Sequence, residues 1–173
     1  MAIQAVVFDW GDTLMRVFPE YEGPMAYWPR VEAMPGVTQA LTELHARYRL
    51  ILATNASDSD ARLVRSALHR VGLDKYLTGV FTANELGARK PDPGFYHAVL
   101  RECGYAASKV VMVGDNYQAD VVGAKQAGLR AIWYNPAMSP GPINSSLHDA
   151  EIQTMSELPA TLGILILHEM DGC

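Results

Sequence analysis

The chain has 173 residues, of which 49% are hydrophobic and 19% charged, and its formal net charge is −5. This length suits one domain with a substantial core, residues 1–173, and the composition is ordinary for a globular protein. A mildly acidic chain without a basic run is a poor candidate for nucleic-acid binding, so we expect no nucleic-acid partner.

Apolar runs of strand length alternate with segments of helical periodicity along the chain. The runs have the apolar character of strands that are buried on both faces of a sheet. In chain order, the strand candidates are Ala2–Phe8, Leu50–Ala53, Gly79–Thr82, Val110–Val113 and Leu129–Tyr134. The helical segments between them cover about 37–48, 57–71, 92–104 and 116–127. The third ends at Gly104 and the fourth is followed by Gly128, and glycine suits a left-handed cap at the end of a helix.

Five strands separated by helices predict an α/β fold with a mostly parallel sheet and helices on both of its faces. We therefore expect a Rossmann-like three-layer architecture around a five-stranded sheet. After the last strand, residues 158–167 (LPATLGILIL) are apolar but about half as long as a membrane helix needs to be, so we interpret them as a buried C-terminal helix.

The location of the protein is predicted from its cysteines and its apolar segments. Cys103 and Cys173 are the only cysteines, and they have neither the pattern of a disulfide framework nor the spacing of a zinc site. The N-terminus carries no basic leader, and no apolar segment is long enough to cross a membrane. We therefore expect a cytoplasmic protein without a membrane partner.

Polar residues follow the predicted strands directly. In parallel sheets of this kind, ligands bind beyond the carboxyl ends of the strands, near the point where the strand order reverses. We therefore expect the residues after these strands to form one site. They are Asp9, Gly11, Asp12 and Thr13 after the first strand, Thr54 and Asn55 after the second, Arg89 and Lys90 after the third, and Asp115 after the fourth, with Asp120 shortly beyond it.

The chemistry of these side chains points to phosphate and magnesium. Three carboxylates at one edge, Asp9, Asp115 and Asp120, repel one another and raise each other's pKa unless a cation lies among them. Oxygen ligands of this kind suit Mg²⁺, which also accepts a substrate phosphate. Thr54 and the amide beside it can hold phosphate oxygens, and Lys90 can offset negative charge on a phosphoryl group. A carboxylate beside Mg²⁺ is also a competent nucleophile.

Four segments in this order, FDWGDTL, LATNAS, GARKPDPGFY and VGDNYQAD, resemble the motifs of the haloacid dehalogenase superfamily. The resemblance covers about residues 3–134 and implies a Mg²⁺-dependent hydrolase, most simply a phosphatase that acts on a small phosphate ester through an aspartyl-phosphate. It implies that Asp9 is the nucleophile, Thr54 holds the phosphoryl group and Lys90 stabilises both. The implied metal ligands are Asp9, the carbonyl of Gly11, Asp115 and Asp120, and the implied phosphate contacts are Asn55, Gly11 and Asp12.

The first motif departs from the pattern of the family at Gly11. Phosphatases of the family have an aspartate there that serves as general acid and base, a role worth roughly 10²–10⁴-fold in rate. In this chain the aspartate stands one position later, at Asp12. Asp12 could take the role, the enzyme could favour leaving groups that need no proton, or the chain could be a non-catalytic protein that binds metal and phosphate for regulation.

Two other chemistries of the superfamily fit the residues less well. Asp9-Trp10-Gly11 is similar to the first motif of phosphonate hydrolases, but that reaction needs a Schiff-base lysine from a cap domain. Haloacid dehalogenation uses an aspartate nucleophile without a metal, which leaves Asp115 and Asp120 unexplained.

The spacing between the motifs leaves room for only a minimal cap. Residues 16–34, rich in aromatic residues, proline and glycine, are the one candidate for a flap over the site. This segment could contact substrate, form a homodimer contact or simply pack over the edge of the sheet.

Overall fold

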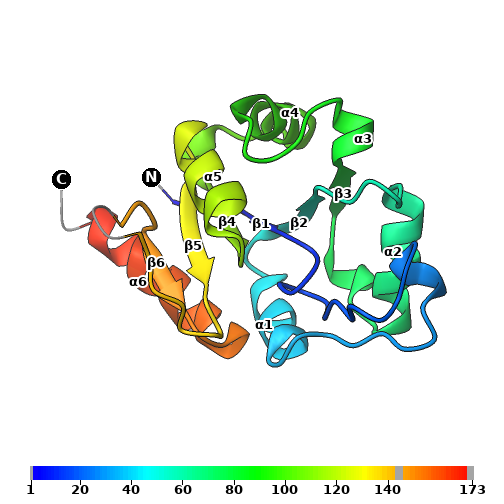
Figure 1. The fold of residues 1–173 in the computed structure, drawn as a ribbon. Coiled ribbons are helices and arrows are strands. Elements are labelled where there is room, and N and C mark those ends of the chain that lie inside the picture. The colour runs from blue at the N-terminus through cyan, green and yellow to red at the C-terminus, as the bar shows by residue number, and fades with distance from the viewer. Residues whose placement is uncertain (1, 143–145, 171–173) are drawn as a thin grey trace.

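The computed structural model describes residues 2–142 and 146–170 (Figure 1). Six parallel strands form its centre, in the order β3-β2-β1-β4-β5-β6. The strands are β1 (Ala5–Phe8), β2 (Arg49–Thr54), β3 (Gly79–Thr82), β4 (Val110–Gly114), β5 (Arg130–Tyr134) and β6 (Ala150–Ile152). The helices are α1 (Val37–Leu44), α2 (Ala61–Arg70), α3 (Ala83–Leu86), α4 (Pro93–Cys103), α5 (Gly123–Gln126) and α6 (Leu158–Met170).

Helices cover both faces of the sheet, as the apolar strands require. In β1 every side chain is buried, and the side chains point alternately to the two faces. Val6 and Phe8 belong to the core under α1, α2 and α6, whereas Ala5 and Val7 belong to the core under α4 and α5. Figure 1 shows these two sets of helices on opposite sides of the strands. The three-layer, Rossmann-like prediction is confirmed.

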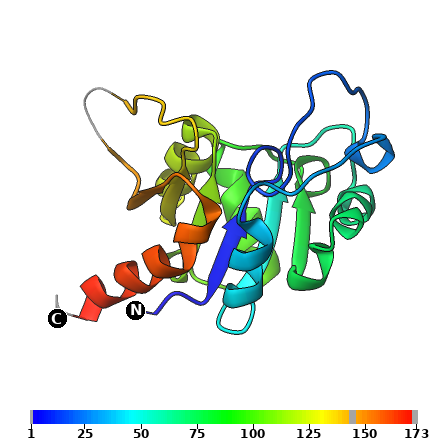
Figure 2. The ribbon, with the colours of Figure 1, turned by 90° about the horizontal axis from the view of Figure 1, so that it is seen from below.

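The strand order reverses at β1, which lies between β2 and β4. Phe8 pairs with Leu52 on one side and with Val113 on the other. The chain therefore leaves β1 and β4 at adjacent points of one edge, where a Rossmann-like sheet binds its ligands. In Figure 2 the strands point towards the loops that follow β1 and β5, and both loops extend beyond this edge.

Several predicted elements need correction. The sheet has six strands rather than five. The additional strand is β6, which pairs with β5 through only three residues. The helix predicted over 116–127 begins as a π-helical turn, Tyr117–Val122, before it continues as α5. The C-terminal helix is buried on one side only: Leu158 and Leu162 are fully buried, whereas Ile164 is 54% exposed.

Within the described residues, no helix is both long and apolar enough to span a membrane. Cys103 forms no disulfide within the part of the chain that the structure describes. The disulfide prediction also concerned Cys173, which lies outside the described residues.

Candidate metal and phosphate site

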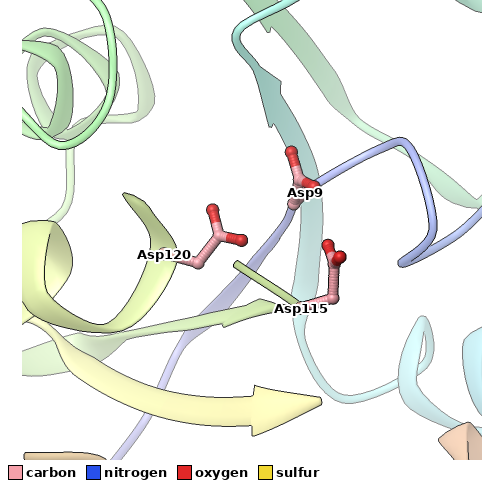
Figure 3. Close-up of side chains that lie close together, drawn as sticks. All are labelled: Asp9, Asp115 and Asp120. Atoms are coloured by element: carbon pink, nitrogen blue, oxygen red, sulfur yellow. The ribbon is translucent and has the colours of Figure 1, made fainter. Parts of the chain in front are cut away.

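Three carboxylates converge at the carboxyl edge of the sheet (Figure 3). Asp9 follows β1, Asp115 follows β4, and Asp120 comes from the π-helical turn after β4. One carboxylate oxygen from each side chain lies within 4.8 Å of the other two. Asp120 is almost fully buried, while Asp9 and Asp115 are partly exposed. The predicted acidic cluster therefore exists, with its open side towards solvent.

Lys90 is the cation of this cluster. Its Nζ donates to Oδ1 of Asp9 and to Oδ1 of Asp120, each at 2.7 Å. Burial lowers the pKa of Lys90, but the charges of Asp9 and Asp120 more than offset this, so the net pKa is raised. The ammonium group stays charged, and it fixes both carboxylates from the buried side of the cluster.

One ammonium group leaves the cluster with excess negative charge. Burial and the charge of Asp9 together raise the pKa of Asp115 to about 6, against hydrogen bonds that lower it. Burial likewise raises the pKa of Asp120 to about 7, although the charge of Lys90 opposes the shift. A second cation would relieve this repulsion. The donors are all carboxylate oxygens at a partly open position, so the residues fit Mg²⁺.

Thr13 ties the carboxylates of two strands together. Its hydroxyl is fully buried and donates to Oδ1 of Asp115 at 3.0 Å, and it lies 3.5 Å from Oδ2 of Asp9. The same oxygen accepts the backbone N–H of Asp115 at 3.2 Å. We expected Thr13 at this edge without giving it a role; only the geometry reveals that it orients Asp115.

Thr54 and Asn55 lie on the other side of Asp9, at the end of β2. The Thr54 hydroxyl accepts the N–H of Ala56 at 3.1 Å, which leaves its own proton free to donate. The Asn55 side chain instead binds the backbone of Lys90: its Nδ2 donates to the Lys90 carbonyl at 2.9 Å, and its Oδ1 accepts the Lys90 N–H at 2.8 Å. In this structure Asn55 therefore positions Lys90.

Gly11 and Asp12 form a compact turn that begins after Trp10. Asp12 has a left-handed φ of 55°, and its Oδ1 accepts the backbone N–H of Val17 at 2.9 Å. A Cβ added at Gly11 would lie 2.8 Å from Cγ2 of Val17. The space for a side chain at position 11 is thus partly filled, and one oxygen of Asp12 is held within the turn.

Two glycines permit the close packing around Asp120 and Lys90. A Cβ at Gly114 would overlap the Asp120 carboxylate, and a Cβ at Gly123 would lie 2.8 Å from the backbone of Pro91, the residue after Lys90. Gly114 is part of the VGDNYQAD segment, but nothing in the sequence showed that a neighbouring carboxylate requires it.

Residues 16–34 lie against α2. Arg70 of α2 donates to the carbonyls of Ala26 at 3.1 Å and Trp28 at 2.6 Å. At its base the segment is joined by backbone hydrogen bonds from Arg16 to Glu32 and from Met34 to Leu14. The packing interpretation accounts for these contacts, while a contact with substrate or with a second copy stays a prediction.

Comparison with known proteins identifies relatives of this chain. Residues 15–128 match the family model of haloacid dehalogenase-like hydrolases. The chain is similar to the pyrimidine 5'-nucleotidase PynA of Streptococcus pneumoniae, with 34% identity over 61% of this chain and 44% of that protein. It is also similar to the phosphoserine phosphatase of Thermus thermophilus, with 40% identity over 45% of this chain and 31% of that protein.

Among solved structures, the 2-haloacid dehalogenase of Pseudomonas syringae superimposes with a TM-score of 0.68 and 36% identity. The match covers 79% of this chain and 55% of the dehalogenase. The chain spans less than half of the length of either curated relative named above.

Proposed function

The chain belongs to the haloacid dehalogenase-like hydrolases, and on this premise we propose that it is a Mg²⁺-dependent phosphatase of small phosphate esters with Asp9 as its nucleophile. The observation that carries the proposal is the position of Lys90, between Asp9 and Asp120 at 2.7 Å from each. A buried ammonium group in this place fixes the attacking carboxylate and offsets the charge of a phosphoryl group. The nucleotidase and phosphatase relatives support the same reaction class.

In the proposed reaction, a carboxylate oxygen of Asp9 attacks phosphorus and the bond from phosphorus to the ester oxygen breaks. The leaving oxygen takes up a proton from solvent and departs as the alcohol, and an aspartyl-phosphate remains. Water then hydrolyses this intermediate to inorganic phosphate, a proton returns to solvent, and Asp9 is regenerated. The Thr54 hydroxyl donates to a phosphoryl oxygen, and Lys90 offsets the charge on the phosphoryl group throughout. Mg²⁺, held by Asp9, the Gly11 carbonyl, Asp115 and Asp120, would supply further charge neutralisation for the phosphate.

The acidic pair Asp115 and Asp120 favours phosphate chemistry over dehalogenation. Both carboxyls have a raised pKa because they are buried near other carboxylates. Lys90 offsets only part of the negative charge of the cluster, so a second cation is favoured there, whereas haloacid dehalogenation needs no metal. A metal-dependent reaction therefore accounts for both Asp115 and Asp120, because they serve as metal ligands in it.

The test is phosphate release from a panel of small phosphate esters and acetyl phosphate, with and without Mg²⁺. We expect Mg²⁺-dependent turnover that Asp9→Asn lowers by at least about 10³-fold. Asp74→Asn is the matched control, because Asp74 lies in the turn before β3, at the opposite edge of the sheet. Turnover that survives in Asp9→Asn would refute the role of Asp9.

A second candidate is a phosphate- and metal-binding regulatory protein without turnover. The observation that favours it is the turn at Gly11, where Val17 occupies part of the space that an acid/base side chain would need. In that case Asp9→Asn would change Mg²⁺ binding in calorimetry, and wild-type protein would release no phosphate from any ester of the panel.

The proposal extends to the organisation of the chain. We assign residues 1–173 to one hydrolase domain, with 16–34 as a minimal flap anchored on α2. The cytoplasmic location and the homodimer stay predictions, as do the phosphate contacts of Gly11 and Asp12.

A further inference from the structure

A pocket of about 370 Å³ opens beside the acidic cluster, at the carboxyl ends of β4 and β5. It shares Asp115 with the cluster, so the pocket and the cluster adjoin each other. The other lining residues come from the turn after β1, from the base of the 16–34 segment, from the end of β5 and from the loop after it. They include Asp12, Met34, Trp133, Tyr134 and Asn135. Figure 2 shows that this loop extends beyond the carboxyl edge of the sheet.

The wall of this pocket is fixed by hydrogen bonds within the protein. The buried Asn135 side chain donates to the Ser139 carbonyl at 3.0 Å and to Glu151 at 2.7 Å, and it accepts the Ser139 N–H at 2.9 Å. The Trp133 indole N–H donates to the Asp115 carbonyl at 3.0 Å, which joins the wall to the cluster. The pocket is therefore formed in advance, as in sites that bind small molecules.

Tyr134 places an unused hydroxyl in this pocket. The residue is only 2% exposed, and its hydroxyl has no hydrogen-bond partner within residues 2–142 and 146–170. No fully buried side-chain oxygen of these residues lacks a partner, so the remaining exposure of Tyr134 includes the hydroxyl. A hydroxyl on a rigid, buried ring that opens into a pocket is a ready partner for a polar ligand.

Asp12 gives the pocket its charge. Among residues 2–142 and 146–170, this carboxylate receives one hydrogen bond, from Val17 to Oδ1, and Oδ2 is available as an acceptor. Arg16, the cation next to this turn, is engaged by Glu32 at 3.3 Å. Once a metal neutralises Asp115, Asp12 still makes the pocket unfavourable for a second anion.

We propose that this pocket binds the alcohol portion of the substrate, and that it selects esters of neutral or cationic alcohols over esters that carry a second anionic group. Tyr134 binds a hydroxyl of the alcohol, and Asp12 accepts a hydrogen bond from it or pairs with an ammonium group. The inference rests on the proposed phosphatase function, and it adds a substrate class that the acidic cluster alone does not define.

The test compares glycerol 3-phosphate with 3-phosphoglycerate, which differ by a hydroxymethyl group in place of a carboxylate. We expect wild-type kcat/KM to favour glycerol 3-phosphate by about tenfold or more. Asp12→Asn should reduce this preference about tenfold, because asparagine tolerates the left-handed φ and keeps the hydrogen bond from Val17 without the charge. Tyr134→Phe should lower kcat/KM for glycerol 3-phosphate roughly 3- to 10-fold more than it lowers kcat/KM for acetyl phosphate. This is the effect expected from the loss of one hydrogen bond.

Tyr105→Phe is the matched control, because Tyr105 lines a different pocket, near the amino ends of β2 and β3. Calorimetric binding of both esters to the Asp9→Asn protein with Mg²⁺ gives the same comparison without turnover. If wild type hydrolyses neither these two esters nor any other member of the panel, the phosphatase function fails, and the binding preference still decides the role of the pocket. Equal affinity for both esters, or a preference that Asp12→Asn and Tyr134→Phe leave unchanged, would overturn the inference.

Discussion

At Thr13, a single buried hydroxyl serves both carboxylates that end β1 and β4. We predict that Thr13→Val, which keeps the shape but removes the hydroxyl, weakens Mg²⁺ binding by about 10- to 100-fold, the usual effect of losing a partner of a metal ligand. Thr13→Ser should restore most of the affinity. Calorimetric titration with Mg²⁺ measures both, and an unchanged affinity in Thr13→Val would show that Asp115 does not need this orientation.

The raised pKa values of Asp115, about 6, and Asp120, about 7, predict the pH dependence of metal binding. Each carboxyl with a raised pKa is protonated below that pKa, and Mg²⁺ binds only the deprotonated form. Affinity should therefore be full near pH 8 and fall as the pH drops through 7 and 6, with protons released on binding. Titrations in two buffers of different ionisation enthalpy measure that release; a constant affinity from pH 8 to pH 5 would contradict it.

Residue types and strand ends were enough to predict which side chains gather at this edge, because parallel strands bring their carboxyl ends together. They were not enough to predict the partner of each side chain. Asn55 was expected to contact phosphate, yet both polar atoms of its amide bind the backbone of Lys90, 35 residues later. Pairings of this kind depend on how two loops approach each other in space, which no local pattern encodes.

At the scale of elements, we predict that the turn over residues 11–17 limits acid/base chemistry. Exchanging its two residues, Gly11→Asp with Asp12→Gly, restores the motif of the family, and glycine suits the left-handed position 12. The new Cβ would still approach Cγ2 of Val17 at 2.8 Å, and adding Val17→Ala removes this contact. We predict that the triple variant raises kcat on esters with poor leaving groups by roughly 10- to 100-fold.

The controls for this prediction are Val17→Ala alone and the double exchange without it. The double exchange should gain less than the triple variant, because Val17 displaces the new carboxylate. If all three proteins hydrolyse a poor-leaving-group ester at the wild-type rate, proton transfer at position 11 is not what limits the reaction.

Elements with a long apolar or helical pattern in the sequence were predicted correctly, and elements with a short pattern were not. Strands β1 to β5 are largely apolar and are separated from one another by helices, whereas β6 has only three residues, of which Glu151 is exposed and Ile152 buried. A strand this short has no periodicity to detect, and it becomes regular only by pairing with β5. The π-helical turn at Tyr117–Val122, in which Asp120 is buried, likewise has the sequence pattern of an ordinary helix.

For the whole molecule, Mg²⁺ should stabilise the fold, because the ligands come from β1 and from the segment after β4 and meet only in the folded state. At a concentration 100 times Kd, binding adds about 2.7 kcal/mol. For a chain of this size that corresponds to a rise in Tm of roughly 5–11 °C. Thermal unfolding with and without Mg²⁺ measures it; Asp115→Asn should abolish the shift, and an equal shift in that variant would place the metal elsewhere.

The measurement that tests the central claim most directly is chemical trapping of the phosphorylated enzyme. Wild-type protein turning over a phosphate ester with Mg²⁺ is quenched and treated with borohydride, which reduces an aspartyl-phosphate to homoserine, and the modified residue is mapped by peptide mass spectrometry. We predict homoserine at position 9, dependent on both the ester and Mg²⁺. Phosphate release without modification of Asp9, or modification at another carboxylate, would contradict the account.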